Sequence, residues 1–116
     1  MKEIIKTINP ATEQIIQEYE YHTTSQIREI IDSAALGHED WKQQSLKTRL
    51  NFILILSSQL SKRKNEFALI ITEEMGKPIS QSISEIDKCI SLCEYYINNS
   101  EKILKLNFIE TNYSTS

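Results

Sequence analysis

The stretch Glu74-Met75-Gly76-Lys77-Pro78 interrupts two long helical patterns, and the expected fold follows from this interruption. Gly76 suits the left-handed position that closes a helix, because glycine has no Cβ to clash with the backbone. Pro78 cannot continue a helix, since it has no N–H to donate. The stretch therefore predicts that one helix ends near residue 75 and that another begins a few residues later.

The segments on both sides carry apolar residues at helical spacing. Upstream, Ser45 can cap a helix over residues 46–75, whose main stripe is Leu50, Ile53, Leu54, Ser57, Leu60, Phe67, Ala68, Ile71 and Met75. Downstream, a helix over residues 80–99 carries Ile83, Ile86, Ile90, Cys93 and Ile97. The upstream helix is also apolar off its stripe, at Phe52, Ile55 and Leu56, so we expect it to be covered from two directions.

An earlier helix is predicted over residues 24–43. Thr23-Thr24-Ser25-Gln26 fits a capping box, in which Thr23 and Gln26 each bond the other's backbone N–H. The apolar face that follows is made of Ile27, Ile30, Ile31, Ala34, His38 and Trp41.

The N-terminal residues 4–21 predict a β-hairpin. Apolar and polar residues alternate after residue 15, and Asn9-Pro10-Ala11-Thr12 supplies a turn in which Asn9 bonds the backbone ahead of it. A lone two-stranded hairpin is marginal in water, so this one must pack against another element. The tail 105–116 holds Leu106, Phe108 and Ile109 without a partner in the chain. The expected fold is mainly α: an N-terminal β-hairpin followed by three helices, in one partial domain over residues 1–116.

Composition excludes several classes of function. The formal charge of −3 argues against nucleic-acid binding, which needs a dense patch of Lys and Arg. No apolar run approaches the ~18 residues of a membrane span, and the N-terminus lacks the apolar stretch of a signal peptide. We therefore expect a cytoplasmic protein. The two glycines, Gly37 and Gly76, are far apart, so neither a Rossmann phosphate turn nor a P-loop can be built from this chain.

The candidate catalytic groups favour structural roles. Cys89 and Cys93 have no further ligands at zinc spacing and lie mid-helix, where a thiol is not activated, so we expect core cysteines. No nucleophile surrounds His22 or His38, and we expect His38 to be a hydrogen-bonded structural residue on an inner helix face. Asp87 lies on the same side of its helix as the apolar stripe. Such a carboxylate bonds backbone amides or a cationic side chain, binds a cation, or becomes protonated.

Four motifs in this order resemble the opening stretch of the aldehyde dehydrogenase superfamily, most closely its succinate-semialdehyde dehydrogenase branch. They are Asn9-Pro10-Ala11-Thr12, Trp41 with the Arg49 region, residues 74–78, and Cys93-Glu94-Tyr95-Tyr96.

The resemblance implies an enzyme that oxidises an aldehyde to a carboxylic acid with NAD or NADP, through a cysteine nucleophile. The family's cofactor loop, general base and nucleophile have no counterpart among these residues, and Cys89 and Cys93 match a helix rather than the nucleophile. The resemblance also implies a weak monovalent-cation site formed by Asp87 and the carbonyls of Thr7 and Ile8.

We therefore expect an N-terminal fragment of such an enzyme, with no catalytic residue, no cofactor of its own and no activity alone. Its expected partner is the remainder of the parent enzyme, or a second copy bound through exposed apolar surface. The alternative is a small helical protein-interaction module that has kept the helices and lost catalysis.

Overall fold

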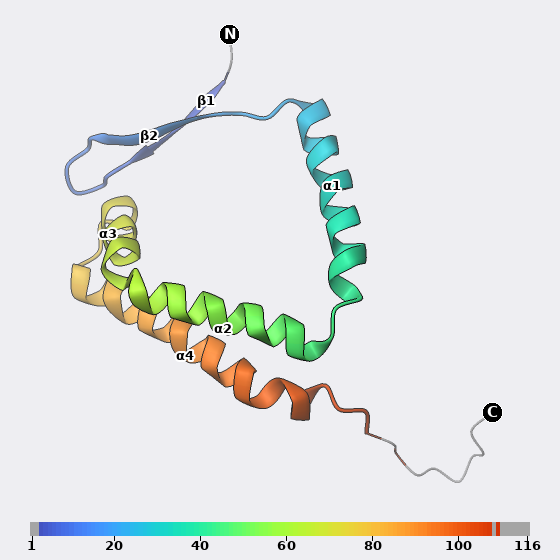
Figure 1. Cartoon of the computed structure of the whole chain (residues 1–116). Helices are drawn as coiled ribbons and strands as arrows, with labels where there is room; N and C mark the ends of the chain where they lie inside the picture. The colour runs from blue at the N-terminus through green and yellow to red at the C-terminus, as the bar shows by residue number, and fades with distance from the viewer. Residues whose placement is uncertain (1–2, 108, 110–116) are drawn as a thin grey trace.

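The computed structural model describes residues 3–107 and 109 of the chain (Figure 1). A two-stranded hairpin is followed by four helices, so the expected mainly helical class is confirmed. The elements are β1 (Ile4–Ile8), β2 (Ile15–Glu20), α1 (Thr24–Lys42), α2 (Leu46–Lys62), α3 (Lys64–Met75) and α4 (Ile79–Ile103).

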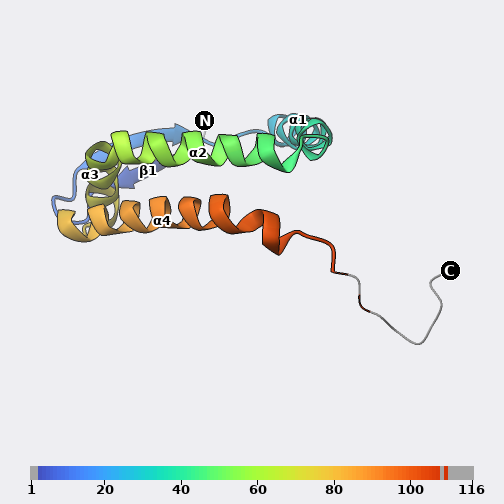
Figure 2. The ribbon, with the colours of Figure 1, turned by 60° about the horizontal axis from the view of Figure 1, so that its bottom comes forward.

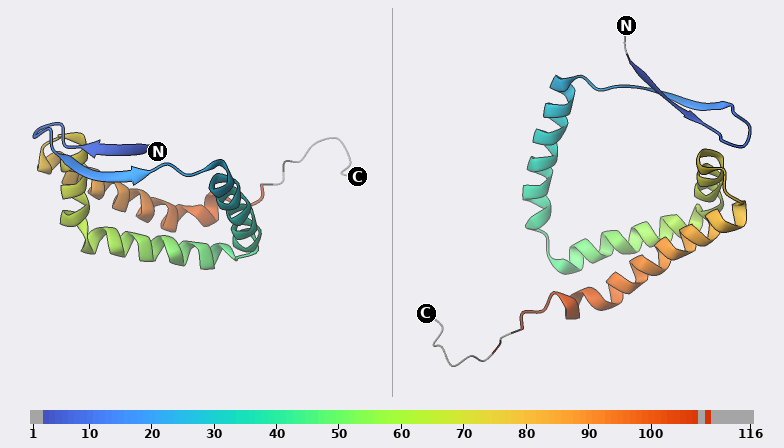
Figure 3. Two further views of the ribbon diagram at one scale, coloured as in Figure 1. Left: turned by 90° about the horizontal axis from the view of Figure 1, so that it is seen from above. Right: turned by 180° about the vertical axis from the view of Figure 1, so that it is seen from behind.

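These elements form an open frame rather than a ball. The hairpin, α1 and α2 follow one another around an open centre, and α4 runs along α2 (Figures 1 and 3). The molecule measures 66 × 40 × 27 Å, with a Cα radius of gyration of 20.9 Å. A compact domain of this length has a radius of gyration of about 13 Å. Much of the apolar surface therefore has no cover from the described residues.

The core lies where α4 packs along α2 and α3 (Figure 2). Its buried side chains are mostly small: Ser57, Ala68, Ser82, Ile86, Cys93 and Ser100. The hydroxyl groups of Thr72 and Ser82 are 2.8 Å apart and share a hydrogen bond between α3 and α4. Small residues along a helix contact let the backbones approach closely, so this seam holds the three helices together.

The expected single helix over 46–75 is wrong in one respect, because the structure divides it at Arg63. The backbone there leaves the helical region, with φ −106° and ψ 19°, so that α2 ends at Lys62 and α3 begins at Lys64. The bend turns α3 back against the start of α4, where Ala68 becomes completely buried. Burial and the bond between Thr72 and Ser82 compensate for the interrupted helix, and such tertiary gains override local propensity.

The expected helix over 80–99 extends further, because α4 continues to Ile103. No glycine or proline stops it after residue 99. Ser100 is buried, so packing supports the additional turn.

Both predicted N-caps are confirmed. Thr23 and Gln26 form the reciprocal capping box of α1, with N–O distances of 3.2 and 2.8 Å. The Ser45 hydroxyl accepts a hydrogen bond of 3.0 Å from the backbone N–H of Thr48 at the start of α2. Each cap satisfies one of the amides that a helix start leaves unpaired.

The hairpin has the predicted turn. Asn9 Oδ1 accepts hydrogen bonds from the backbone N–H groups of Ala11 and Thr12, at 2.9 and 3.3 Å. The strands are antiparallel and the register shifts next to Thr7, where the pairing steps from Gln17 to Ile15.

The hairpin rests on the loop between α3 and α4. Gly76 adopts φ +69°, the expected left-handed closing position of α3. A Cβ on Gly76 would lie 2.6 Å from Pro10 Cγ, well inside contact distance. The two most distinctive stretches of the sequence therefore touch, and glycine is required there both by the backbone angle and by the neighbouring ring.

Candidate functional site: an uncovered docking surface

The candidate docking surface is exposed apolar surface on α1, on α2 and at the beginning of the tail. On α1 no residue is buried, although Ile27, Ile30 and Ile31 keep their helical spacing. His38 is exposed as well, so its expected inner position is wrong. The apolar face of α1 is present as predicted, but the described part of the chain does not cover it.

Helix α2 carries a second uncovered face. Phe52, Ile55 and Leu56 are exposed to 53%, 49% and 47%. We call these three residues the outer face of α2. The ring of Phe52 meets Trp41 edge to face, with centroids 5.4 Å apart, and this contact joins the end of α1 to α2. The sequence predicted that this helix needs cover from two directions, and the described residues leave this side of it about half exposed.

The beginning of the tail is exposed too. Leu106 and Ile109 have 80% and 84% of their surface accessible, as expected. Phe108 and residues 110–116 lie outside the described residues. Large exposed apolar patches are typical both of binding surfaces and of aggregation-prone regions in proteins.

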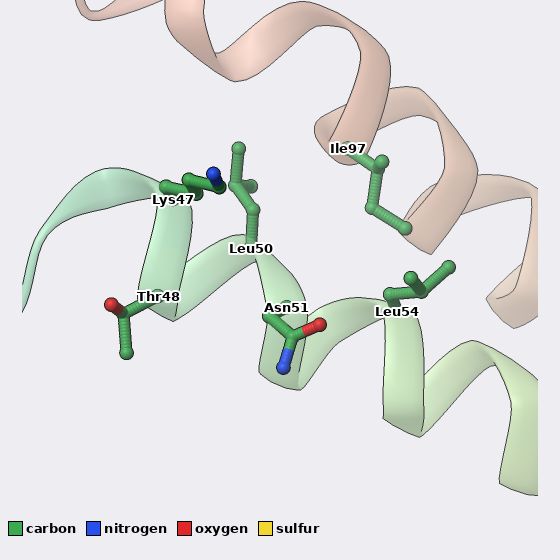
Figure 4. Close-up of a pocket in the computed structure, with 6 residues that line it drawn as sticks. All are labelled: Lys47, Thr48, Leu50, Asn51, Leu54 and Ile97. Carbon is green, nitrogen blue, oxygen red and sulfur yellow. The ribbon is translucent and has the colours of Figure 1, made fainter.

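The gap between α2 and α4 forms a groove of about 430 Å³ on one side of the helix pair. Figure 4 shows Leu50 and Leu54 of α2 pointing toward Ile97 of α4, with Lys47 beside Leu50. Thr48 and Asn51 point away from α4. The groove is apolar at its base and has no grouping of catalytic residue types.

A second hollow of about 390 Å³ lies where the end of α1 meets α2 and α4. It is lined by Trp41, Leu46, Arg49, Leu50, Ile53, Leu92, Cys93, Tyr96, Ser100 and Leu104. Arg49 is its single charged residue. The Nε atom of Arg49 is buried and has no hydrogen-bond partner. Sequence reasoning missed this donor, because its lack of an acceptor depends on what surrounds it in three dimensions.

Asp87 does not lie in the expected inward position. Half of its side chain is exposed, and its carboxylate forms an ion pair with Lys64 Nζ of α3. An ammonium group thus provides the positive charge that a bound cation would otherwise bring. The cation site of Asp87 with the Thr7 and Ile8 carbonyls stays a prediction, and residues 3–107 and 109 contain no cluster of three or more His, Cys, Asp or Glu side chains that could hold a metal.

The cysteines divide between surface and core. Cys93 is buried, as expected, whereas Cys89 is exposed, so its expected core position is wrong.

Arg63 and Glu66, outside the candidate docking surface, form an ion pair that shifts the pKa of each group. Arg63 donates from Nε and Nη2 to the two carboxylate oxygens of Glu66, at 2.8 and 2.5 Å. These hydrogen bonds raise the pKa of Arg63 and lower the pKa of Glu66. Both groups are exposed at the bend between α2 and α3. We therefore assign this ion pair to the bend and not to a catalytic site.

The two glycines of the chain do not form a dinucleotide phosphate turn. Gly37 lies inside α1 and Gly76 closes α3, so neither lies on a turn from strand to helix. A dinucleotide phosphate turn needs glycines in that position.

Within the described residues no helix has both the length and the hydropathy to cross a membrane.

Comparison with known proteins settles the family. A profile of the aldehyde dehydrogenase family matches residues 1–116. The chain belongs to the aldehyde dehydrogenase family.

Two curated relatives are named for the same aldehyde. The probable succinate-semialdehyde dehydrogenase [NADP(+)] of Synechocystis sp. is 31% identical over 97% of this chain and 25% of its own length. The succinate semialdehyde dehydrogenase [NAD(P)+] Sad of Escherichia coli is 32% identical over 85% of this chain and 21% of its own length. The chain therefore spans about a quarter of the length of the curated relatives that it matches.

Solved structures agree on the fold. Gox0499, in a structure concerned with its cofactor and substrate selection, has a TM-score of 0.89 at 27% identity, covering 96% of this chain and 25% of the other. The glyceraldehyde-3-phosphate dehydrogenase GapN of Methanocaldococcus jannaschii, in complex with NADP, has a TM-score of 0.84 at 22% identity, covering 97% and 24%. The open frame is thus also found as part of larger enzymes.

Proposed function

We propose that this chain is the N-terminal segment of an NAD(P)-dependent aldehyde dehydrogenase of the succinate-semialdehyde type. In this proposal the segment supplies no catalytic group. It acts as a framework that packs against the rest of the enzyme through the face of α1, the outer face of α2 and the hollow around Arg49.

The proposal rests on the match of this chain to one part of a larger protein, combined with the exposure of its apolar side chains. Gox0499 contains this same open frame in a quarter of its chain. The frame taken alone leaves Ile31, Phe52 and Leu54 more than half exposed. Fully burying an exposed side chain of this size stabilises by about 1.5–3 kcal/mol, so covering the exposed half of each gains roughly 0.8–1.5 kcal/mol.

The chemistry belongs to the remainder of the enzyme in this proposal. The names of the Synechocystis and Escherichia coli relatives support succinate semialdehyde as substrate and NADP or NAD as oxidant. This chain takes part by holding the enzyme's shape, and it binds no cofactor by itself.

A chimera tests the proposal. The whole chain replaces the matched quarter of the Synechocystis enzyme, and NADP reduction with succinate semialdehyde is followed by absorbance. We expect the chimera to oxidise the aldehyde, whereas the isolated chain does not. The Synechocystis enzyme with the matched quarter deleted is the control, and we expect it to be inactive.

Two results would overturn the proposal. One is a chimera no more active than the deletion control. The other is oxidation of the aldehyde by the isolated chain. An inactive chimera together with a stable, monomeric isolated chain would favour the helical interaction module instead.

A further inference from the structure

The hollow around Arg49 contains a donor without an acceptor. Arg49 Nε is buried and makes no hydrogen bond, although the residue lies beside Ser100 and Tyr96 in the same lining. A buried donor that has lost water and found no partner is costly, and native proteins rarely keep one. The described residues supply no acceptor to this Nε, so the acceptor is a water or a group from another polypeptide segment, reached by a shift of the Arg49 side chain.

The lining of the hollow indicates what kind of molecule brings it. Trp41, Arg49 and Tyr96 meet there, and Trp, Tyr and Arg are the residue types that dominate the binding energy of protein interfaces. Most of the remaining lining is aliphatic, which suits an apolar side chain beside the acceptor. A guanidinium surrounded by apolar side chains binds a carboxylate best, because the two groups form parallel charge-assisted hydrogen bonds.

We propose that the hollow is a docking site for a polypeptide segment that presents an Asp or Glu carboxylate to Arg49. The occupant is the remainder of the dehydrogenase, so the inference rests on the proposed function. In the docked state the Arg49 side chain shifts to expose its guanidinium, the carboxylate accepts from that guanidinium, and a neighbouring apolar side chain lies against Trp41 and Tyr96.

The test uses Arg49→Met, because methionine keeps an unbranched apolar stem and removes the donors. Arg28→Met on α1 is the matched control, since Arg28 is exposed. Each variant is made in the isolated chain and in the chimera. Urea unfolding is measured for the isolated chain, and the rate of thermal inactivation is measured for the chimera.

In the isolated chain we expect Arg49→Met to leave the urea midpoint unchanged or to raise it, since the donor has no partner to lose. In the chimera we expect Arg49→Met to inactivate at least about tenfold faster than Arg28→Met. Removal of the guanidinium leaves its partner carboxylate buried and unpaired. A purely internal role of Arg49 predicts the reverse pattern, with the isolated chain as strongly affected as the chimera.

The acceptor is identified by replacing each Asp and Glu of the Synechocystis part of the chimera with Asn or Gln. One replacement should speed inactivation as much as Arg49→Met and add nothing further when the two are combined. The inference is wrong if no replacement couples to Arg49, if Arg49→Met matches Arg28→Met in the chimera, or if the isolated chain loses stability. An unmutated chimera without activity would instead remove the proposed function, and this inference with it.

Discussion

Gly76→Ala should destabilise the chain by more than an ordinary glycine substitution. Gly76 adopts φ +69°, and a left-handed backbone costs a residue with a Cβ roughly 1–2 kcal/mol. The new methyl group would also lie 2.6 Å from Pro10 Cγ, so the hairpin must move away from the loop between α3 and α4. Displacing the hairpin adds on the order of 1 kcal/mol, the cost of a forced contact in a packed region.

The two contributions can be separated by a double-mutant cycle with Pro10→Ala. Pro10 Cβ would be 3.5 Å from the new methyl group, an ordinary contact, so Pro10→Ala removes the clash and leaves only the cost of the backbone angle. We expect Gly76→Ala to cost about 2–3 kcal/mol in the wild type and about 1–2 kcal/mol beside Pro10→Ala. Urea unfolding followed by far-ultraviolet circular dichroism measures both values. Equal costs in the two backgrounds would refute the contact, and a cost under about 0.5 kcal/mol would refute the backbone argument as well.

Three further predictions concern charge and cofactor. Asp87→Asn should change the free energy of unfolding by less than about 1 kcal/mol, because its pair with Lys64 is half exposed; a urea midpoint that rises in potassium relative to tetramethylammonium, and only with Asp87 present, would support the predicted cation site. Arg63 lowers the pKa of Glu66, so the pair stabilises the fold above the pKa of a glutamate in the unfolded chain and loses this effect as pH falls through the lowered pKa. A carboxyl titration by NMR should give a higher Glu66 pKa in Arg63→Ala than in the wild type. An identical pKa in the two proteins would contradict the contact. NADP or NAD titrated against Trp41 fluorescence should show no saturable binding below about 1 mM, a binding free energy of roughly −4 kcal/mol.

Sequence reasoning succeeded where the determining energy is local. The capping box of Thr23 and Gln26, the turn at Asn9 and the closing position of Gly76 each depend on residues within four positions. Hydrogen bonds over such short spans are specified by residue type and order, so they can be read before any tertiary structure is known.

It failed where one element decides the surroundings of another. The division of the long helix at Arg63 carries no glycine or proline signal, and packing of α3 on α4 determines it. This same bend places Lys64 at the start of α3 beside Asp87, so the cationic side chain among the alternatives for that carboxylate could not be named without knowing the break. The unpaired donor of Arg49 was equally hidden, because it depends on the whole lining of the hollow.

The contact between Pro10 and Gly76 also sets an order of events during synthesis. Gly76 is added 66 residues after Pro10, its contact in the folded chain. Ribosomes add about 5–20 residues per second, so this contact cannot form until roughly 3–13 seconds after Pro10 is added. Two strands without a third element are marginally stable, and Ile4, Ile8 and Ile15 remain about half exposed even in the folded chain. The first strands to be translated are thus among the last to be secured, which gives a ribosome-bound chaperone its longest access to residues 4–20.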